Sequence, residues 1–324
     1  MTPPSGSPSA AGFHMPAEWE RHEATWIAWP HNEEDWPGRF APIPWVYAEI
    51  VRKLAAVERV RILVQDEDVE NAARDALRKV GAELSAVDFY QLPTDRVWTR
   101  DFAPSFVVAG AEVAAVKWRF NAWAKYDNWQ RDDAAGRKIP ELSGKRVWDA
   151  PIVLEGGSIE VNGHGWVMTT EECLLSSTQA RNPELSKPQV EAALGDYLGV
   201  ERVLWLRNGI AGDDTHGHID DLARFVDQET IVIASEPDRG DHNYEPLREN
   251  RETAHPRREV PPPLPIDACW VRSRSISWPP GAGRGDRGSE ETAGETPASY
   301  VRRLSGKSGS RKARGRQPPK RWPN

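Results

Sequence analysis

Short strands alternate with helices along most of this chain, and this alternation is typical of a mixed α/β protein. The segment 59–64, RVRILV, has the alternation expected of a strand, and the segment 66–80 after it has the pattern of a helix that a glycine ends. A second helix is predicted between Pro188 and Gly199, with a strand at 202–206 after it. Strand and helix therefore recur several times within one stretch of chain.

Hairpins are predicted between these elements. A single strand is expected at 112–120, and the segments 158–161 and 166–170 flank an Asn-Gly-His-Gly turn. A last hairpin pairs 222–226 with 229–234. No G-x-G-x-x-G motif follows a predicted strand, so the sequence does not support nucleotide binding of the Rossmann type.

Charge is divided unevenly along the chain. Residues 1–250 hold 26 Lys and Arg against 42 Asp and Glu, a balance of −16, whereas residues 251–324 hold 16 against 7, a balance of +9. An acidic body favours small cationic partners and disfavours nucleic acid. The last 74 residues contain 11 Pro and 8 Gly but only 7 Leu, Ile, Val or Phe, so they bury too little apolar surface to offset the entropy of ordering.

This composition predicts three segments. Residues 1–14 and 253–324 are expected to be disordered tails, the second of them basic, and residues 15–252 to form the globular part. The first residues lack the apolar core of a signal peptide, and no run of eighteen apolar residues predicts a membrane span. With only two cysteines, Cys173 and Cys269, a disulfide framework is excluded and a reducing cytoplasm is the expected location.

Four short motifs carry residue types that are used in chemistry. Three of them place Asp101 in WTRDFAP, Glu155 in EGGS and the trio His216, His218 and Asp220 in HGHID. The fourth is the aromatic and polar stretch FNAWAKY at 120–126. Structural interpretations stand beside the functional ones: a surface ion pair of Asp101 with its neighbouring arginine, and an ordinary turn at Gly-Gly. In extended geometry the HGHID trio would share one face, and that spacing is compatible with zinc.

Six strings, in this order, show a resemblance to a known family: MPAEWERHEATWIAWPHNEEDWPG, VWTRDFAPSF, FNAW, LEGGSIEVNG, TTEECLL and DTHGHIDDLARF. Together they make residues 15–250 resemble the agmatine deiminases, which belong with the bacterial peptidylarginine deiminases in the guanidine-modifying superfamily. The resemblance implies a pentein fold, a five-bladed pseudo-symmetric α/β propeller of ββαβ units, here expected to lack its last blade. It implies no cofactor and no metal, which disfavours the zinc interpretation.

The resemblance also implies a role for each motif. Asp101 and Asp220 would hold the planar guanidinium of agmatine, Glu155 would support it, and His218 would transfer protons. The tryptophans that would face the cation are Trp98 and Trp123. A cysteine thiolate attacks the guanidinium carbon, and water then releases N-carbamoylputrescine, a precursor of putrescine in polyamine biosynthesis.

The nucleophile of the family is not found in this sequence. In the family it follows a histidine in a glycine-rich stretch near the C-terminus, and this chain contains no His-Cys pair. Cys173 lies in TTEECLL, which is not the family's nucleophile position, and Cys269 lacks the flanking glycines and histidine. The abrupt change in composition near residue 252 leads to the hypothesis of a frameshifted or otherwise truncated gene product.

Three interpretations of the function therefore stand. The first is an agmatine deiminase, a hydrolase of C–N bonds in linear amidines. The second is a catalytically dead remnant that at most binds guanidinium compounds. The third is an enzyme of the peptidylarginine deiminase type. In each, the expected partner is a small cationic guanidine rather than a nucleic acid or a membrane. The sequence does not decide whether the chain forms a homo-oligomer.

Overall fold

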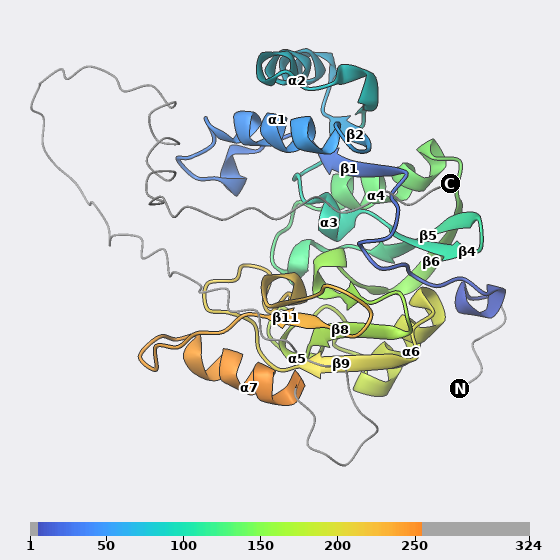
Figure 1. Cartoon of the computed structure of the whole chain (residues 1–324), viewed down its shortest axis with the longest axis vertical. Helices are drawn as coiled ribbons and strands as arrows, with labels where there is room; N and C mark the ends of the chain where they lie inside the picture. The colour runs from blue at the N-terminus through green and yellow to red at the C-terminus, as the bar shows by residue number, and fades with distance from the viewer. Residues whose placement is uncertain (1–5, 255–324) are drawn as a thin grey trace, which may run out of the picture. The chain divides into compact units, whose positions relative to one another are not determined.

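The computed structural model describes residues 6–254, and all structural statements refer to them. Their strands are β1 (Ala24–Ala28), β2 (Arg59–Val64), β3 (Val87–Gln91), β4 (Ser105–Ala109), β5 (Glu112–Arg119), β6 (Arg146–Val153), β7 (Glu160–Val161), β8 (Trp166–Thr170), β9 (Arg202–Leu206), β10 (Ala223–Phe225) and β11 (Ile231–Ile233). Their α-helices are α1 (Ile43–Leu54), α2 (Glu67–Val80), α3 (Thr99–Phe102), α4 (Gln130–Leu142), α5 (Glu171–Leu175), α6 (Lys187–Leu198) and α7 (Tyr244–Ala254) (Figure 1). The chain is therefore a mixed α/β protein, as predicted.

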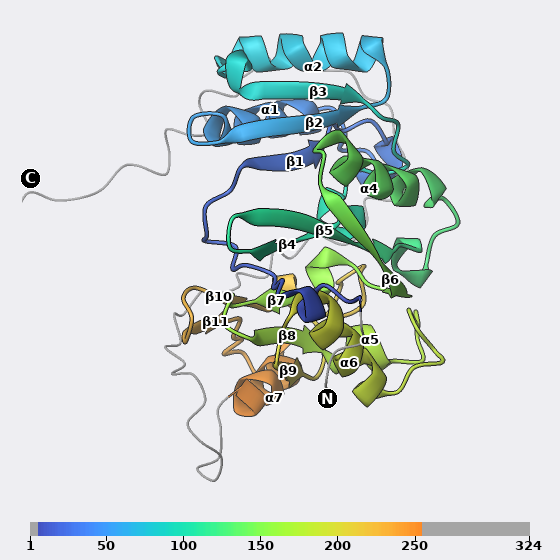
Figure 2. The same cartoon turned by 90° about the vertical axis from the view of Figure 1, so that its right-hand side faces the viewer.

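One arrangement of strands and helix recurs along the described chain. Strand β5 pairs antiparallel with β4 and parallel with β6, and helix α4 makes the parallel crossover. The same order returns in β7, β8, α6 and β9, and it begins again in β10, β11 and α7. In the first sheet β2 is likewise central, but β1 runs parallel to it because α1 joins the two strands. Figure 2 shows the first three sheets following one another in chain order, with β10 and β11 beside β7 and β8.

Local sequence signals explain the elements that were predicted. The bounds of β2, β8 and β9 agree with the prediction, and both predicted hairpins form, with β7, β10 and β11 shorter than predicted. Helix α2 begins after Asp66, whose side chain accepts a hydrogen bond from the Val69 amide, and ends at Gly81 in the left-handed region. Helix α6 begins with a capping box between Ser186 and Gln189.

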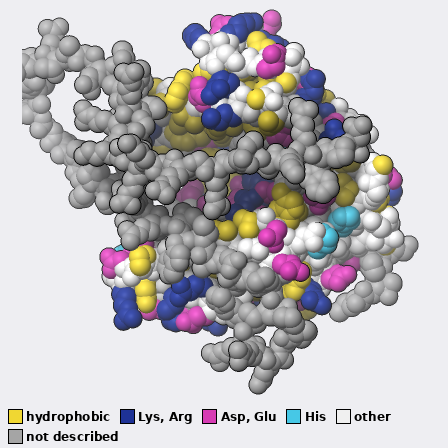
Figure 3. Space-filling model, viewed as in Figure 1, with side chains coloured by type: hydrophobic (Ala, Val, Ile, Leu, Met, Phe, Trp, Pro, Cys, Tyr) yellow, Lys and Arg dark blue, Asp and Glu magenta, His cyan; other side chains and the backbone are white. Residues whose placement is uncertain are grey.

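Charged side chains of both signs occur on the described surface (Figure 3). Acidic and basic side chains lie interspersed on the described part of the visible face (Figure 3). Among the described helices, none combines the length and the apolar character needed to cross a bilayer. Since charges of both signs share this face, the net negative charge of the body does not form one continuous acidic surface on it.

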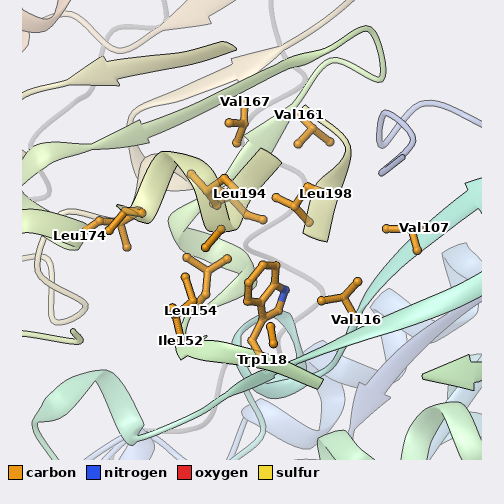
Figure 4. Close-up of a cluster of buried hydrophobic side chains, with 14 of the residues drawn as sticks. Val107, Val116, Trp118, Ile152, Leu154, Val161, Val167, Leu174, Leu194 and Leu198 are labelled. Carbon is orange, nitrogen blue, oxygen red and sulfur yellow. The ribbon is translucent and has the colours of Figure 1, made fainter. Parts of the chain in front are cut away.

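The largest hydrophobic cluster joins the repeat that contains β4–β6 to the repeat that contains β7–β9. Trp118 and Val116 of β5 point toward Leu194 and Leu198 of α6 (Figure 4), and all four side chains are almost completely buried. Burying side chains of this size contributes about 1.5–3 kcal/mol each relative to leaving them exposed. This cluster fixes the β4–β6 repeat against the β7–β9 repeat. The site described below lies at the connections between successive repeats.

The N-terminal segment differs from its prediction. Residues 6–14, which the sequence placed in a disordered tail, include a short 3-10 helix, and Phe13 is buried in the largest hydrophobic cluster. The Met15 amide donates a hydrogen bond to the carbonyl of Leu198, and Trp148 donates one to the carbonyl of Gly6. The burial of Phe13 and these hydrogen bonds together hold a segment whose composition indicates a tail. The predictions for residues 1–5 and 255–324 lie outside the described residues.

Candidate active site

The predicted site residues lie in the connections between successive repeats. Asp101 lies between β3 and β4, Glu155 between β6 and β7, and His218 with Asp220 between β9 and β10. Each connection leaves the last strand of one repeat and enters the first strand of the next. The repeated topology therefore brings four residues from three distant segments into one cluster.

Asp101 is held by two hydrogen bonds to its two oxygens. Its Oδ1 accepts from the Gly157 amide at 3.0 Å, and its Oδ2 accepts from Nε1 of Trp123 at 3.1 Å. Burial raises the pKa of Asp101, and the positive charge of His218 partly offsets this rise. The structural interpretation of a surface pair with Arg100 is wrong, because Asp101 is buried and Arg100 pairs with Glu18 instead.

His218 lies at the centre of the cluster with carboxylates on both sides. Its Nδ1 is 3.8 Å from Oδ1 of Asp101 and 3.8 Å from Oδ1 of Asp220, and its Nε2 is 3.9 Å from Oε2 of Glu155. Only 2% of the residue is exposed. Burial acts to lower the pKa of His218, but the charge of Asp101 and the other neighbours raises it well above the ordinary value. These neighbours therefore favour the cationic form of the imidazole.

Glu155 is completely buried and is paired with an arginine that the sequence analysis missed. Nε of Arg181 lies 3.1 Å from Oε1 of Glu155, and the same guanidinium donates to the carbonyls of Gln179 and Thr215. Burial acts to raise the pKa of Glu155, but the positive charges of His218 and Arg181 outweigh it and lower the pKa. Arg181 precedes Asn-Pro in a loop, where no local pattern signals a buried ion pair.

Asp220 is the most exposed of the four clustered side chains. About 24% of its side chain is exposed, and Nε of Arg100 lies 3.9 Å from its Oδ2. Burial raises the pKa of Asp220, and the charge of His218 opposes this. Behind Arg100, Glu18 pairs with both Arg100 and Arg224, and these charges link the segment before β1 to the cluster.

Glycine is required at position 157 because the cluster closes over it. A Cβ added there would lie 2.5 Å from Nδ1 of His218, 2.7 Å from Oδ1 of Asp101 and 2.9 Å from Oδ2 of Asp220. Any side chain would therefore displace the groups that define the site. The Gly-Gly pair was predicted to allow a close approach to a ligand, and in the structure it allows a close approach of the protein's own side chains.

The two predicted tryptophans differ in their environment. Trp98 is 39% exposed, and its ring centroid lies 5.8 Å from that of Trp36. Trp123 is only 5% exposed and uses its Nε1 to hold Asp101. It lies in a turn in which Ala122, Trp123 and Ala124 all have positive φ, of 48°, 59° and 51°. Three successive non-glycine residues in this region are unfavourable, at about 1–2 kcal/mol each, so tertiary contacts hold this turn.

The structure does not support the extended geometry predicted for HGHID. His216 has a φ of 64°, and both of its ring nitrogens are engaged elsewhere, by Ser176 and Glu172. The Asp213 carboxylate instead closes the loop by accepting from the amides of Gly217 and His218. The glycine at 217 allows this reversal with a φ of 92°. A metal site of His216, His218 and Asp220 is therefore excluded by the contacts of the His216 ring.

Cys173, which was not predicted to be a site residue, contacts the cluster from helix α5. Its sulfur, a carboxylate oxygen of Glu155 and a ring nitrogen of His218 lie within 4.8 Å of one another, and all three residues are buried. Burial raises the pKa of the Cys173 thiol. Thr170 caps the short helix α5 that carries this cysteine, by accepting from the Cys173 amide. No local pattern in the sequence predicts this contact.

Carboxylates surround the buried histidine and favour its cationic form. This class of site suits the binding of a cationic group and the transfer of protons. Comparison with known proteins agrees with this class. Residues 14–302 match the Porphyromonas-type peptidyl-arginine deiminase family, and the chain belongs to that family. It is 38% identical to the agmatine deiminase of Ectopseudomonas mendocina and 38% identical to that of Pseudomonas aeruginosa, over 251 residues each.

Solved structures give the same result. The agmatine deiminase of Enterococcus faecalis matches with a TM-score of 0.74 and 32% identity, covering 81% of this chain and 72% of that one. The agmatine deiminase of C. jejuni matches with a TM-score of 0.64 and 29% identity, covering 74% and 70%. The sequence matches to the two Pseudomonas-type relatives cover 75% of this chain and 66% of each relative's length, so the chain spans just under two thirds of those proteins.

Proposed function

We propose that this chain is an agmatine deiminase, which hydrolyses agmatine to N-carbamoylputrescine and ammonia. The observation that carries the proposal is the position of Asp101 and Asp220, each 3.8 Å from the same nitrogen of His218. Two carboxylates beside one another suit the planar guanidinium, which offers five N–H donors and stays protonated at neutral pH. The relatives that support the proposal are themselves named agmatine deiminases.

The residues divide the reaction between them. Asp101 and Asp220 bind the guanidinium through charge-assisted hydrogen bonds, and Glu155 holds His218 in its cationic form. A thiolate adds to the guanidinium carbon, and His218 gives its proton to the nitrogen that leaves as ammonia. His218, now neutral, takes a proton from water as the water attacks the amidino-thioether carbon. The tetrahedral carbon then expels the thiolate while its hydroxyl group loses the remaining proton to solvent, and the neutral ureido product is released.

The tryptophans have separate roles in this proposal. Trp98 precedes Asp101 by three residues and its side chain is exposed, so its ring is the one proposed to face the cationic substrate. Trp123 is assigned to orienting Asp101, because its indole nitrogen already donates to that carboxylate. This revises the role that the resemblance implied for Trp123.

No described residue is assigned as the thiolate that attacks the guanidinium carbon. Within residues 6–254 the one cysteine is Cys173, which is fully buried against Glu155 and His218 and has a raised pKa. A thiol held in this way is a poor nucleophile. The other cysteine, Cys269, lies outside the described residues. The nucleophile is therefore proposed to come from outside this range, or the chain binds guanidinium compounds without hydrolysing them.

We also propose the pentein fold, a five-bladed arrangement around the cluster whose last blade is expected to be missing from this chain. Support comes from the recurrence of the strand–strand–helix–strand order and from the placement of site residues in successive connections. The proposed activity contributes to putrescine formation, and the scarcity of cysteine favours the cytoplasm.

The test is formation of a ureido product from agmatine by the purified chain, with an arginine-containing peptide as the competing substrate. Turnover of agmatine but not of the peptide supports the proposal, and the reverse preference supports a peptidylarginine deiminase. Cys269→Ala and Cys173→Ala identify the thiol that is used. If no product forms, agmatine binding is measured by calorimetry with Asp101→Asn, and with Asp149→Asn as the exposed control. Binding that Asp101→Asn weakens and Asp149→Asn does not supports the non-catalytic remnant.

A further inference from the structure

Two buried polar atoms in the candidate site face each other without hydrogen-bond partners. Within the described residues, Oε2 of Glu155 and Nε2 of His218 have none, and they lie 3.9 Å apart. Leaving a buried polar group unpaired is unfavourable by about 1–3 kcal/mol. The other oxygen of Glu155 is already engaged by Arg181, so the carboxylate is oriented with one oxygen left toward the histidine.

The sulfur of Cys173 completes a set of three donor atoms. It lies within 4.8 Å of both the carboxylate and the imidazole. Thiolate, imidazole and carboxylate are the three side-chain donors that zinc accepts, at about 2.0–2.3 Å from the metal. Donors around a tetrahedral zinc ion lie about 3.5 Å apart, so small side-chain movements close the set around an ion.

The charges around the set also favour a cation. Asp101 and Asp220 lie on the far side of the imidazole, 3.8 Å from its Nδ1. Together with Glu155 and a deprotonated Cys173 they supply four negative charges. Once zinc has displaced the His218 proton, the positive side chains beside these groups are Arg181 at Glu155 and Arg100, 3.9 Å from Asp220. A divalent ion therefore replaces two protons, one from the imidazolium and one from the thiol, without creating an uncompensated charge.

We propose that Glu155, Cys173 and His218 form a buried zinc site that blocks the proton-transfer role of His218. Three protein donors leave the fourth tetrahedral position for water. The ion inhibits because zinc on Nε2 replaces one of the two imidazolium protons, so His218 can no longer alternate between its cationic and neutral forms at Nδ1, the nitrogen that faces Asp101 and Asp220. This site differs from the HGHID trio in the sequence, because it shares only His218 with it.

The two cysteines of the chain provide a matched pair of variants. The full-length protein is freed of metal with a chelator and titrated with Co²⁺, whose thiolate complexes give a near-ultraviolet charge-transfer band, and Zn²⁺ is then used as the competitor. One equivalent is expected to bind to the wild type and to Cys269→Ser with this band. Cys173→Ser is expected to lose the band and at least tenfold in Zn²⁺ affinity. The measurement needs no substrate, so its outcome is independent of whether agmatine is hydrolysed.

His218→Asn provides a second variant if Cys173→Ser does not fold, since it retains both cysteines. It is expected to lose at least tenfold in Zn²⁺ affinity. The proposal is overturned if the wild type binds no stoichiometric Zn²⁺, if Cys173→Ser retains the charge-transfer band, or if Cys269→Ser loses it. Unchanged affinity in a folded His218→Asn variant overturns it as well.

Discussion

Nε1 of Trp123 donates a 3.1 Å hydrogen bond to Oδ2 of Asp101, so a residue in a left-handed turn fixes the carboxylate that faces His218. The turn itself is held by two neighbours. Oδ1 of Asn121 accepts from the Ala124 amide, and Gln179 donates to the Trp123 carbonyl. The indole therefore acts on the site through Asp101, and the unfavourable backbone is maintained where it positions a functional group.

Trp123→Phe is expected to weaken agmatine binding by about tenfold. The variant loses the hydrogen bond to Asp101, and a hydrogen bond to a charged group contributes about 1.5–3 kcal/mol. The phenyl ring keeps the packing around the carboxylate, so the expected loss is at the lower end of this range. Trp98→Phe keeps an aromatic face and is expected to weaken binding less. Calorimetry measures both affinities, and circular dichroism confirms that both variants are folded. A Trp123→Phe variant that binds agmatine as tightly as the wild type would show that Asp101 does not depend on the indole.

Gly157→Ala is expected to abolish measurable agmatine binding, because the new methyl group would lie 2.5 Å from Nδ1 of His218 and 2.7 Å from Oδ1 of Asp101. Gly195→Ala in α6 is the control, since the nearest atom to its added Cβ is a backbone oxygen at 3.3 Å and lies away from the cluster. Calorimetry and thermal unfolding are measured for both variants. Retained binding in Gly157→Ala would mean that the cluster relaxes around the methyl group.

The sequence predicted elements whose signals are local. Strand β9 alternates along its own length, and helix α2 carries its own cap and its terminal glycine, so both were predicted near their observed bounds. Helices α1 and α4 were not predicted. Helix α4 contains Gly136 and Pro140, both unfavourable in helices, and it forms where Gly136 packs against the backbone of Phe102. Its stability comes from tertiary packing, which periodicity does not report.

The site was predictable only where motifs contain its residues. Asp101, Glu155, His218 and Asp220 each lie in a recognisable string, and the structure brings them together. Arg181 contacts the same cluster from a segment without a distinctive pattern, and Cys173 lies in the string TTEECLL, to which the sequence assigned no role in the site. Their contribution depends on the approach of distant connections, and a single sequence carries no signal for such an approach.

Arg181→Met is expected to lower the free energy of unfolding by about 3–5 kcal/mol, because it leaves the completely buried carboxylate of Glu155 without its arginine partner. Lys138→Ala breaks an exposed pair with Glu141 and is expected to cost about 1 kcal/mol or less. Urea unfolding of both variants gives the comparison. Equal losses would show that the buried pair has no larger role than the exposed one.

Asp132 is expected to make the protein less stable as the pH rises. Its carboxylate is buried and accepts from the amides of Asp95 and Arg96, while its other oxygen has no partner among the described residues. Burial raises its pKa from 3.8 to about 7. Between these values the folded protein holds a proton that the unfolded chain has released, so stability falls as the pH rises through this window.

The variant Asp132→Asn tests this linkage, because an amide keeps the accepting oxygen and cannot ionise. The free energy of unfolding is measured in urea at pH 5, 6 and 7 for both proteins. The wild type is expected to lose stability relative to Asp132→Asn by up to about 1.4 kcal/mol per pH unit in this range. A difference between the two proteins that stays constant, or that changes in favour of the wild type as the pH rises, would show that Asp132 is ionised in the folded protein throughout.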